Sequence, residues 1–176
     1  YGDAGAVTGN EETLLAKVRR LRDHGRTSKY EHEQVGFGER LDGLQAAVLT
    51  TKLQHLETWT EARRCHAKLY NELLTGSNVV TPVASSHVRH VHHLYVIRTP
   101  RHDDLAAHLK SCGISTGIHY PLPLHRQPAY SNGGGADVTL PHTDEAANEV
   151  LSLPMYPELK NEQIHYVVKK VREFFQ

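Results

Sequence analysis

The feature that most constrains the fold is a long helical pattern that follows a polar loop punctuated by glycines. Asp42 stands where a helix N-cap is expected, and apolar residues follow at helical spacing as far as Leu73. Thr75-Gly76 is a typical C-terminal stop. Such a helix would be about 50 Å long at about 1.5 Å per residue, which exceeds the diameter of a small domain. We expect it to leave one packed body and enter another, although periodicity alone equally allows a long core or coiled-coil helix.

Length, charge and cysteine content exclude several classes of protein. The 176 residues suit one large domain, or one and a half small ones. Lysine and arginine together number 20, as do aspartate and glutamate, and no basic stripe is present, so we expect no nucleic-acid partner. Only two cysteines occur, Cys65 and Cys112, which fits a reducing cytoplasm better than a disulfide framework. No apolar run reaches the roughly 18 residues of a membrane span, so we expect a cytoplasmic protein without membrane contact.

Strands and helices are expected to alternate after Gly76, which favours a compact α/β layer. Before the long helix we expect a short strand at 6–8 and a helix capped by Asn10. A mobile loop is expected at 131–138, where three glycines are consecutive. Beyond Gly76, the pattern predicts strands at 79–81, 91–98, 114–118 and 151–154, and helices at 103–111, at 143–151 and from Asn161 onwards.

Four histidines, at positions 87, 90, 92 and 93, raise the question of a metal site. Zinc needs three or four converging ligands, whereas a strand would place only His90 and His92 on one face and His93 on the other. Two ligands are too few, so we predict no metal site and expect His93 to point inward. Cys65, on the long helix, is expected to be a small core residue.

Six segments of the sequence occur in an order that resembles one known family. They are YGDAGAV at 1–7, RDHG at 22–25, KYEHEQVGFGERLDGLQAAVL at 29–49, HLYVIR at 93–98, GIHYPLPLHRQPAY at 117–130 and LSLPMYPELKNEQI at 151–164. Together they resemble the pyridoxal-phosphate-dependent nucleotide-sugar aminotransferases of the DegT/StrS family.

The resemblance implies the C-terminal part of a fold-type-I, aspartate-aminotransferase-like α/β protein, in which a long linking helix precedes a small α/β domain. Residues 1–58 would be a remnant of the large cofactor domain with the start of the linking helix. Residues 59–176 would be the small C-terminal domain. The resemblance also implies a homodimer with active sites at the subunit interface.

In this family the lysine that forms the Schiff base with pyridoxal phosphate lies a few residues before the YGD motif, which here starts at Tyr1. None of the lysines in the sequence has that context, and transaldimination needs an amine that later serves as a general base. We therefore expect the C-terminal half of an enzyme that moves an amino group from glutamate to a keto nucleotide-sugar. We expect it to bind no cofactor and to be inactive alone, with a separate N-terminal half as a candidate partner. The alternative is a non-catalytic dimerisation or interaction module derived from the family.

Two cofactor-facing residues are implied in the GFGERLD segment. Many family members carry asparagine at the position of Gly38, where it reaches the partner's cofactor phosphate; glycine offers only its backbone N–H. The alternative for Gly38 is a turn that needs positive φ. Arg40 is suited to bidentate anion binding, or else holds the loop to Glu39 or Asp42.

The resemblance also implies four substrate-facing residues. His119 and Tyr120 follow a predicted strand and precede a loop stiffened by prolines, and this segment is implied to approach the sugar or its diphosphate. The alternative for Tyr120 is a packed ring with a hydrogen-bonded hydroxyl. Tyr30 and His32 lie in the loop that, in the family, lines the substrate entrance near the dimer interface.

Overall fold

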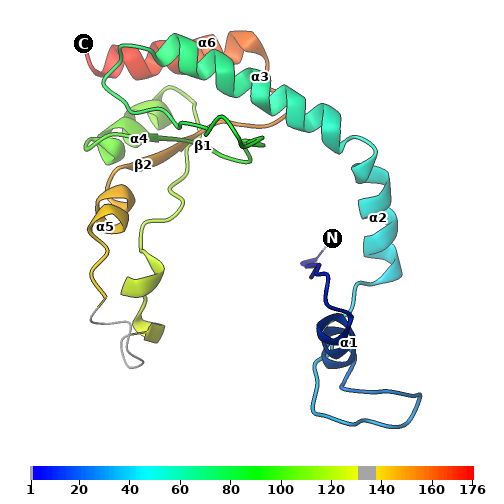
Figure 1. The fold of residues 1–176 in the computed structure, drawn as a ribbon. Coiled ribbons are helices and arrows are strands. Elements are labelled where there is room, and N and C mark those ends of the chain that lie inside the picture. The colour runs from blue at the N-terminus through cyan, green and yellow to red at the C-terminus, as the bar shows by residue number, and fades with distance from the viewer. Residues whose placement is uncertain (1, 131–137) are drawn as a thin grey trace. The chain divides into compact units, whose positions relative to one another are not determined.

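The structure is a computed structural model that describes residues 2–130 and 138–176 (Figure 1). It divides into two compact units, Tyr1–Leu56 and Glu57–Gln176. The mobile loop expected at 131–138 falls, apart from Val138, outside the described residues. No helix in the described part of the chain is long and apolar enough to cross a membrane.

The first unit contains helices α1 (Glu12–Leu21) and α2 (Gly43–Leu53). Helix α1 has Glu12 in its first turn and arginines in its last, as the helix dipole favours. The Asp42 N–H donates to Gln45 Oε1 (3.1 Å), which closes the first turn of α2. The strand expected at 6–8 does not form, because this segment makes no backbone pairing with another.

The long helix expected from Asp42 onwards is interrupted, and in this respect the prediction is wrong. A turn at Gln54-His55 separates α2 from α3 (Leu56–Leu74). The N–H of His55 bonds to the carbonyl of Lys52 (3.0 Å), three residues back, so the helical ladder tightens and stops. No glycine or proline marks this position in the sequence, which is why periodicity alone missed the break.

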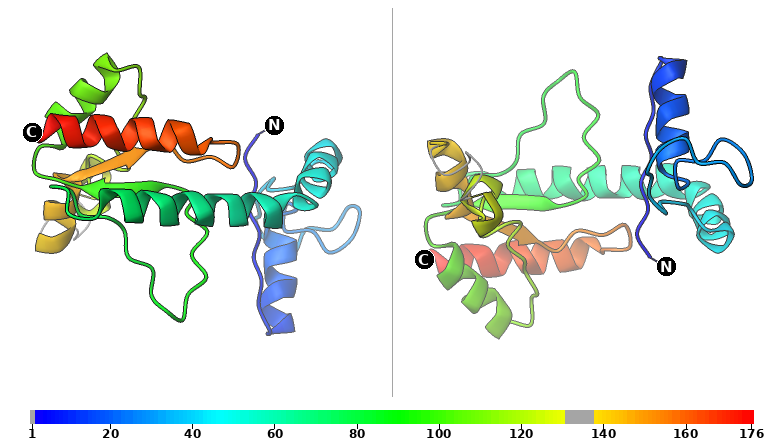
Figure 2. Two further views of the ribbon diagram at one scale, coloured as in Figure 1. Left: turned by 90° about the horizontal axis from the view of Figure 1, so that it is seen from above. Right: turned by 90° about the horizontal axis from the view of Figure 1, so that it is seen from below.

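The second unit is built on two antiparallel strands, β1 (Tyr95–Arg98) and β2 (Val150–Leu153), with Tyr95 opposite Leu153. Helices α3 and α6 (Asn161–Phe174) lie side by side along the strand pair, and α4 (His102–Ser111) packs against α6 and β2 (Figures 1 and 2). The core between these layers consists mainly of buried side chains from α3, β1, α4, β2 and α6, among them Tyr70, Leu74, Tyr95, Ile97, Leu105, Leu109, Leu151, Ile164, Val168 and Val171.

Several expected elements are shorter than the sequence suggested. The strand at 91–98 begins only at Tyr95, and those at 79–81 and 114–118 are reduced to single bridges, Val80 with Arg98 and Gly117 with Ser152. The helix expected at 143–151 is α5 (Pro141–Ala147), since Val150 instead joins β2. Two 3₁₀ turns, Leu124–Arg126 and Pro128–Tyr130, follow the proline-rich segment.

Two burial predictions were also wrong. Cys65 is exposed, because the buried face of α3 carries Ala67, Tyr70 and Leu74, and Cys65 lies on the opposite face. His92 is buried and His93 is exposed. The φ angle of His92 is +47°, so the backbone leaves the extended conformation and the alternation of strand faces does not reach residue 93.

Candidate functional site

The GFGERLD loop folds back on the end of α1 in the first unit. Asp23 and Gly38 face each other in an antiparallel bridge. The bridge is closed by His24 N–H to Phe37 O and by Glu39 N–H to Arg22 O, both 2.9 Å. Because the neighbours make these bonds, the N–H of Gly38 points away from the bridge and has no partner among the described residues.

Gly38 is explained by close approach rather than by a turn. Its φ angle lies outside the left-handed region, so a positive φ does not demand glycine here. A Cβ at this position would lie 3.2 Å from Cε1 of His24, closer than an ordinary contact. Glycine therefore leaves room for the His24 imidazole.

Arg40 is held by neither Glu39 nor Asp42. Its Nε lies 4.0 Å from Oδ1 of Asp23, too far for a hydrogen bond, while the same carboxylate accepts from Arg26 Nε at 2.8 Å. The guanidinium is exposed and has no other partner within the described residues. Its donors are therefore available to an incoming anion.

Arg40 lies on the wall of an open groove of about 920 Å³ that is contained entirely within the first unit. The extended segment 3–9, one face of α1, Phe37 and residues 39–41 line this groove, and Gly38 does not. Arg19 and Arg22 also line it, beside apolar side chains such as Phe37. Asp3 and Glu39 line it too, so the groove combines charges of both signs with an apolar wall.

Tyr30 and His32 lie in the same loop but do not line the groove. The Tyr30 side chain is 80% exposed. Nδ1 of His32 lies 2.9 Å from the carbonyl oxygen of His24. A carbonyl can only accept, so Nδ1 of His32 carries the proton and the ring is fixed to the loop.

In the second unit, the structure brings His119 and Tyr120 together at a pocket of about 500 Å³. Their rings meet edge to face with centroids 5.5 Å apart. Tyr120 is 73% exposed and its hydroxyl has no hydrogen-bond partner in the described chain, so the packed alternative is not what the structure shows. Both side chains are available to a ligand.

Asp144, on α5, fixes the far wall of this pocket. Its carboxylate accepts two bonds from Arg126, at 3.2 and 2.7 Å, and lies 3.0 Å from Nε2 of His125. The hydrogen-bonded Arg126 guanidinium, and to a lesser extent His125, lower the pKa of Asp144 below its usual value. The proline-rich segment is therefore tied to the helix that completes the pocket.

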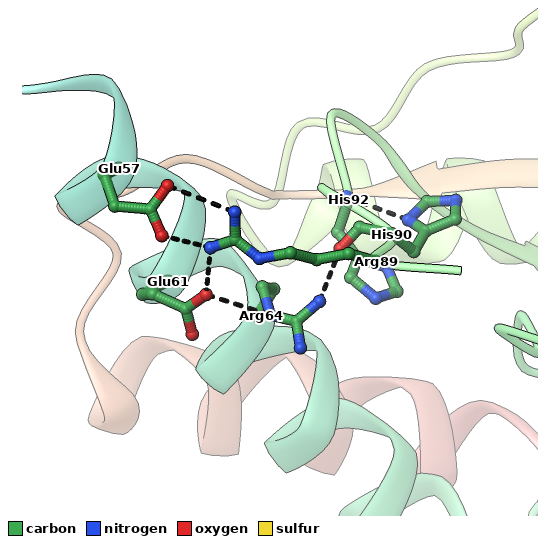
Figure 3. Close-up of polar contacts among 6 residues, drawn as sticks. All are labelled: Glu57, Glu61, Arg64, Arg89, His90 and His92. Carbon is green, nitrogen blue, oxygen red and sulfur yellow. Dashed lines mark hydrogen bonds and ion pairs between the residues drawn. The ribbon is translucent and has the colours of Figure 1, made fainter. Parts of the chain in front are cut away.

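A further polar cluster joins the loop before β1 to α3 (Figure 3). Arg89 forms ion pairs with Glu57 and Glu61, the contact with Glu61 measuring 2.5 Å. The bond from Arg89 is the main cause that lowers the pKa of Glu61, and the two carboxylates raise the pKa of Arg89. We call this cluster the Arg89 clamp.

Beside the clamp, the His90 and His92 rings are 4.2 Å apart, and the His92 N–H donates to His90 Nδ1 (Figure 3). Arg64 donates to the His90 carbonyl at 3.2 Å. Burial is the main cause that lowers the pKa of His92, with His90 and Arg64 adding to it. Within the described residues, no group of three or more histidine, cysteine, aspartate or glutamate side chains could hold a metal ion.

The six residues that the sequence singled out fall into two groups: four in one loop of the first unit, of which Arg40 alone lines the groove, and two at the pocket of the second unit. Sequence reasoning missed Gly117, Asp144 and Ser152, which shape the second group. Ser152 was the one with a signal, since it is the single hydroxyl in an otherwise apolar strand, LSLP.

Comparison with known proteins identifies the framework that carries both groups. Residues 1–172 match the DegT/DnrJ/EryC1/StrS aminotransferase family. The chain belongs to this family. Solved structures that share this fold include one described as a pyridoxal phosphate (PLP) form and one described as having bound pyridoxamine phosphate (PMP).

Two curated relatives are similar over almost the whole chain. A pleiotropic regulatory protein of Geobacillus stearothermophilus is 48% identical over 100% of this chain and 48% of its own length. A dTDP-3-amino-3,4,6-trideoxy-alpha-D-glucose transaminase of Streptomyces venezuelae is 40% identical over 99% of this chain and 46% of its own. The chain thus spans about half the length of the curated relatives it matches.

The fold agrees with this assignment. The structure of S. venezuelae DesV in complex with a ketimine intermediate is 41% identical, with a TM-score of 0.89, over 96% of this chain and 45% of DesV. The α/β architecture matches the C-terminal part of family aminotransferases, which confirms the predicted fold class.

Proposed function

We propose that this chain supplies the C-terminal half of a PLP-dependent aminotransferase that moves an amino group from glutamate to a keto nucleotide-sugar. The observation that carries the proposal is the match of residues 1–172 to the family, together with the fold shared with DesV. The curated S. venezuelae relative is named as a transaminase of a dTDP-sugar.

The residues of the first unit fit the phosphate of the cofactor. Gly38 offers a backbone N–H that has no partner among the described residues, and Arg40, two residues later, offers a loosely held guanidinium. Both are groups that bind phosphate oxygens in proteins. When bound, PLP would supply the electron sink that amino transfer requires. Gly38 and Arg40 are thus the proposed cofactor-binding residues of this chain.

The residues of the second unit are proposed to face the substrate. His119 and Tyr120 present a ring nitrogen and a hydroxyl at a pocket whose volume suits a small molecule. Tyr30 and His32 are proposed to border the substrate entrance, with Tyr30 exposed and His32 fixed to the loop.

We further propose that these residues need the other half of a family member, and a second copy of the chain, to catalyse transamination. None of the lysines in the sequence lies in the context of the Schiff-base lysine. The chain also covers only 48% of the length of its Geobacillus relative. A dimer is proposed because the resemblance places the family's sites at a subunit interface.

Complementation with the N-terminal half of the Geobacillus relative tests this proposal. We expect the visible absorbance of an internal aldimine, and transamination of a keto dTDP-sugar, only when both halves and PLP are mixed. Arg40→Ala should weaken PLP binding by the mixture, while Arg19→Ala serves as a matched control that also lines the groove. Full transamination by the chain alone would contradict the need for a second half.

A second candidate is a non-catalytic dimerisation or interaction module. It is supported by α2, which is mostly apolar yet contributes no buried residue; Leu44 and Leu53 are 85% and 67% exposed. Contiguous exposed apolar surface is typical of an interface. Sedimentation velocity distinguishes the candidates when combined with complementation: a self-associating chain that never gains activity supports the module, and a clean monomer at micromolar concentration contradicts it.

A further inference from the structure

We propose that Ser152 and Gly117 are positioning residues for His119, holding its imidazole so that Nε2 carries the proton and donates to an oxygen of the sugar substrate. The inference rests on the proposed function for the identity of the ligand, but the positioning itself concerns the chain alone. It assigns a role to two residues that contribute no atom to the wall of the pocket.

The backbone first brings Ser152 next to the residue that precedes the His119 segment. Gly117 N–H donates to Ser152 O (3.2 Å), and Ser152 N–H donates to Gly117 O (2.7 Å). Ser152 lies within β2 and is only 5% exposed, so its hydroxyl has little access to water. Its Oγ lies 2.9 Å from Nδ1 of His119.

The tautomer of His119 follows from the hydrogen bond that the Ser152 hydroxyl donates. A buried hydroxyl loses more by leaving its proton undonated than by leaving a lone pair unused. Nδ1 of His119 is the one partner of Oγ among the described residues, so the hydroxyl donates to it. The neutral ring then carries its proton on Nε2, and this atom has no partner in the described chain.

Gly117 provides the space in which the ring lies. A Cβ on Gly117 would be 2.7 Å from Cε1 of His119, and 3.5 and 3.6 Å from Nδ1 and Nε2. The φ angle of Gly117 lies outside the left-handed region, so alanine would not strain the backbone there. Gly117→Ala therefore displaces the imidazole without another evident cost.

The pocket beyond the ring suits a pyranose. Leu122, Leu124 and Val150 give it apolar walls, and Gln127 and Thr143 add polar groups beside His119 and Tyr120. A sugar ring presents apolar C–H faces and oxygen-bearing edges, which match such a mixture. A donor at Nε2 pairs with a sugar hydroxyl or carbonyl oxygen. In the other tautomer, with the proton on Nδ1, Nε2 would accept a hydrogen bond from the sugar instead of donating one.

The first measurement is the tautomer of His119 in the ¹⁵N-labelled chain above neutral pH. We expect the ¹⁵N shifts of a protonated Nε2 and an accepting Nδ1. Ser152→Ala should remove this preference and Ser152→Thr should restore it. Ser115→Ala should leave it unchanged, because Ser115 is exposed and its side chain has no hydrogen-bond partner among the described residues. A protonated Nδ1 in the unaltered chain would overturn the positioning role.

The second measurement is binding of dTDP-glucose, compared with dTDP, by the chain mixed with the N-terminal half of the Geobacillus relative. We expect dTDP-glucose to perturb the Nε2 signal more than dTDP does. Gly117→Ala should weaken the binding of dTDP-glucose by up to about tenfold, which is the effect of losing one hydrogen bond. It should have little effect on the binding of dTDP. Gly43→Ala, where a Cβ meets nothing within 4 Å, is the matched control.

The outcomes separate the two proposals. The expected tautomer, together with equal binding of dTDP-glucose and dTDP in every variant, would overturn the contact between Nε2 and the sugar. No activity of the mixture with any keto sugar nucleotide would count against the proposed function, while the tautomer measurement still decides the role of Ser152.

Discussion

The phenol rings of Tyr70 and Tyr95 stack in the core of the second unit, with centroids 4.7 Å apart and planes inclined by 23°. Tyr70 lies on α3 and Tyr95 on β1, and both are fully buried. The Tyr70 hydroxyl donates to Pro154 O (3.1 Å), and the Tyr95 hydroxyl donates to Asn71 Oδ1 (2.6 Å). The stack therefore joins α3 to β1 and to the residue that follows β2.

We expect Tyr70→Ala to lower the free energy of unfolding of the second unit by about 3–5 kcal/mol, as for large aromatic truncations in cores. Tyr70→Phe should cost about 1 kcal/mol, because it removes one hydrogen bond and leaves the Pro154 carbonyl unpaired. Urea unfolding followed by circular dichroism measures both changes. Tyr30→Phe, at an exposed ring, is the control, and equal stability of Tyr70→Ala and the unaltered chain would contradict this role of the stack.

The same two phenols predict the response to alkali. Burial raises the pKa of both hydroxyls well above the ordinary value of 10.0, and the neighbouring phenols of Tyr95 and Tyr156 raise that of Tyr70 further. The unfolded chain therefore releases these protons first, so the free energy of unfolding declines as pH rises above about 10. Ultraviolet absorbance of tyrosinate should show two late-ionising tyrosines that titrate together with unfolding. Ionisation of every tyrosine before any loss of circular dichroism would contradict it.

The sequence predicted an element well where the spacing of its apolar residues alone determines which face is buried. The apolar stripe of α6, from Ile164 to Val171, is buried as its spacing indicated. Prediction was poorer where an element depends on a distant partner. Residues 114–118 have strand composition, but in the described chain they pair with β2 only at Gly117, opposite Ser152, so the expected strand is reduced to a single bridge.

The candidate sites show the same difference between features set by local sequence and features set by contacts between distant residues. The resemblance implied that His119 and Tyr120 face the substrate; both line one pocket, and their contact with substrate stays a prediction. The contact of Ser152 with His119 joins residues 33 positions apart, and the Asp144–Arg126 pair joins residues 18 apart. Neither distance can be obtained from local spacing, because both depend on how β2 and α5 pack against the proline-rich segment.

The buried His92 predicts weakening in mild acid. Its pKa is lowered, so at pH values below the ordinary 6.5 the unfolded chain binds this proton and the folded chain does not. The free energy of unfolding should therefore decline from about pH 6.5 downward and level off below the folded pKa of His92. His92→Asn, which tolerates the positive φ, should flatten this decline, and exposed His87→Asn should not. The comparison requires urea unfolding at several pH values.

The Arg89 clamp should control opening of the loop before β1. Arg89→Ala removes the ion pairs with Glu57 and Glu61, so we expect faster hydrogen exchange of amides at 84–92 while the core amides keep their rates. Because Arg89 lowers the pKa of Glu61, acid should open the same loop once pH falls through that lowered value. Arg19→Ala, which breaks an exposed pair in the first unit, is the control. Unchanged exchange in Arg89→Ala would show that the loop is held by other contacts.

Alanine at three glycines of the first unit should give a graded series. At Gly25 a Cβ would lie 1.7 Å from the Gln34 carbonyl oxygen, and φ is +69°, so Gly25→Ala should disrupt the loop at a cost above about 3 kcal/mol. At Gly38 the 3.2 Å approach to the His24 ring needs only a small shift, which should cost less than about 1 kcal/mol. Gly43→Ala meets nothing within 4 Å and should be neutral or slightly stabilising. Hydrogen exchange of the α1 amides measures the loss of stability in all three variants. If Gly38→Ala destabilised the loop as much as Gly25→Ala does, this would contradict the spacing found between Gly38 and His24.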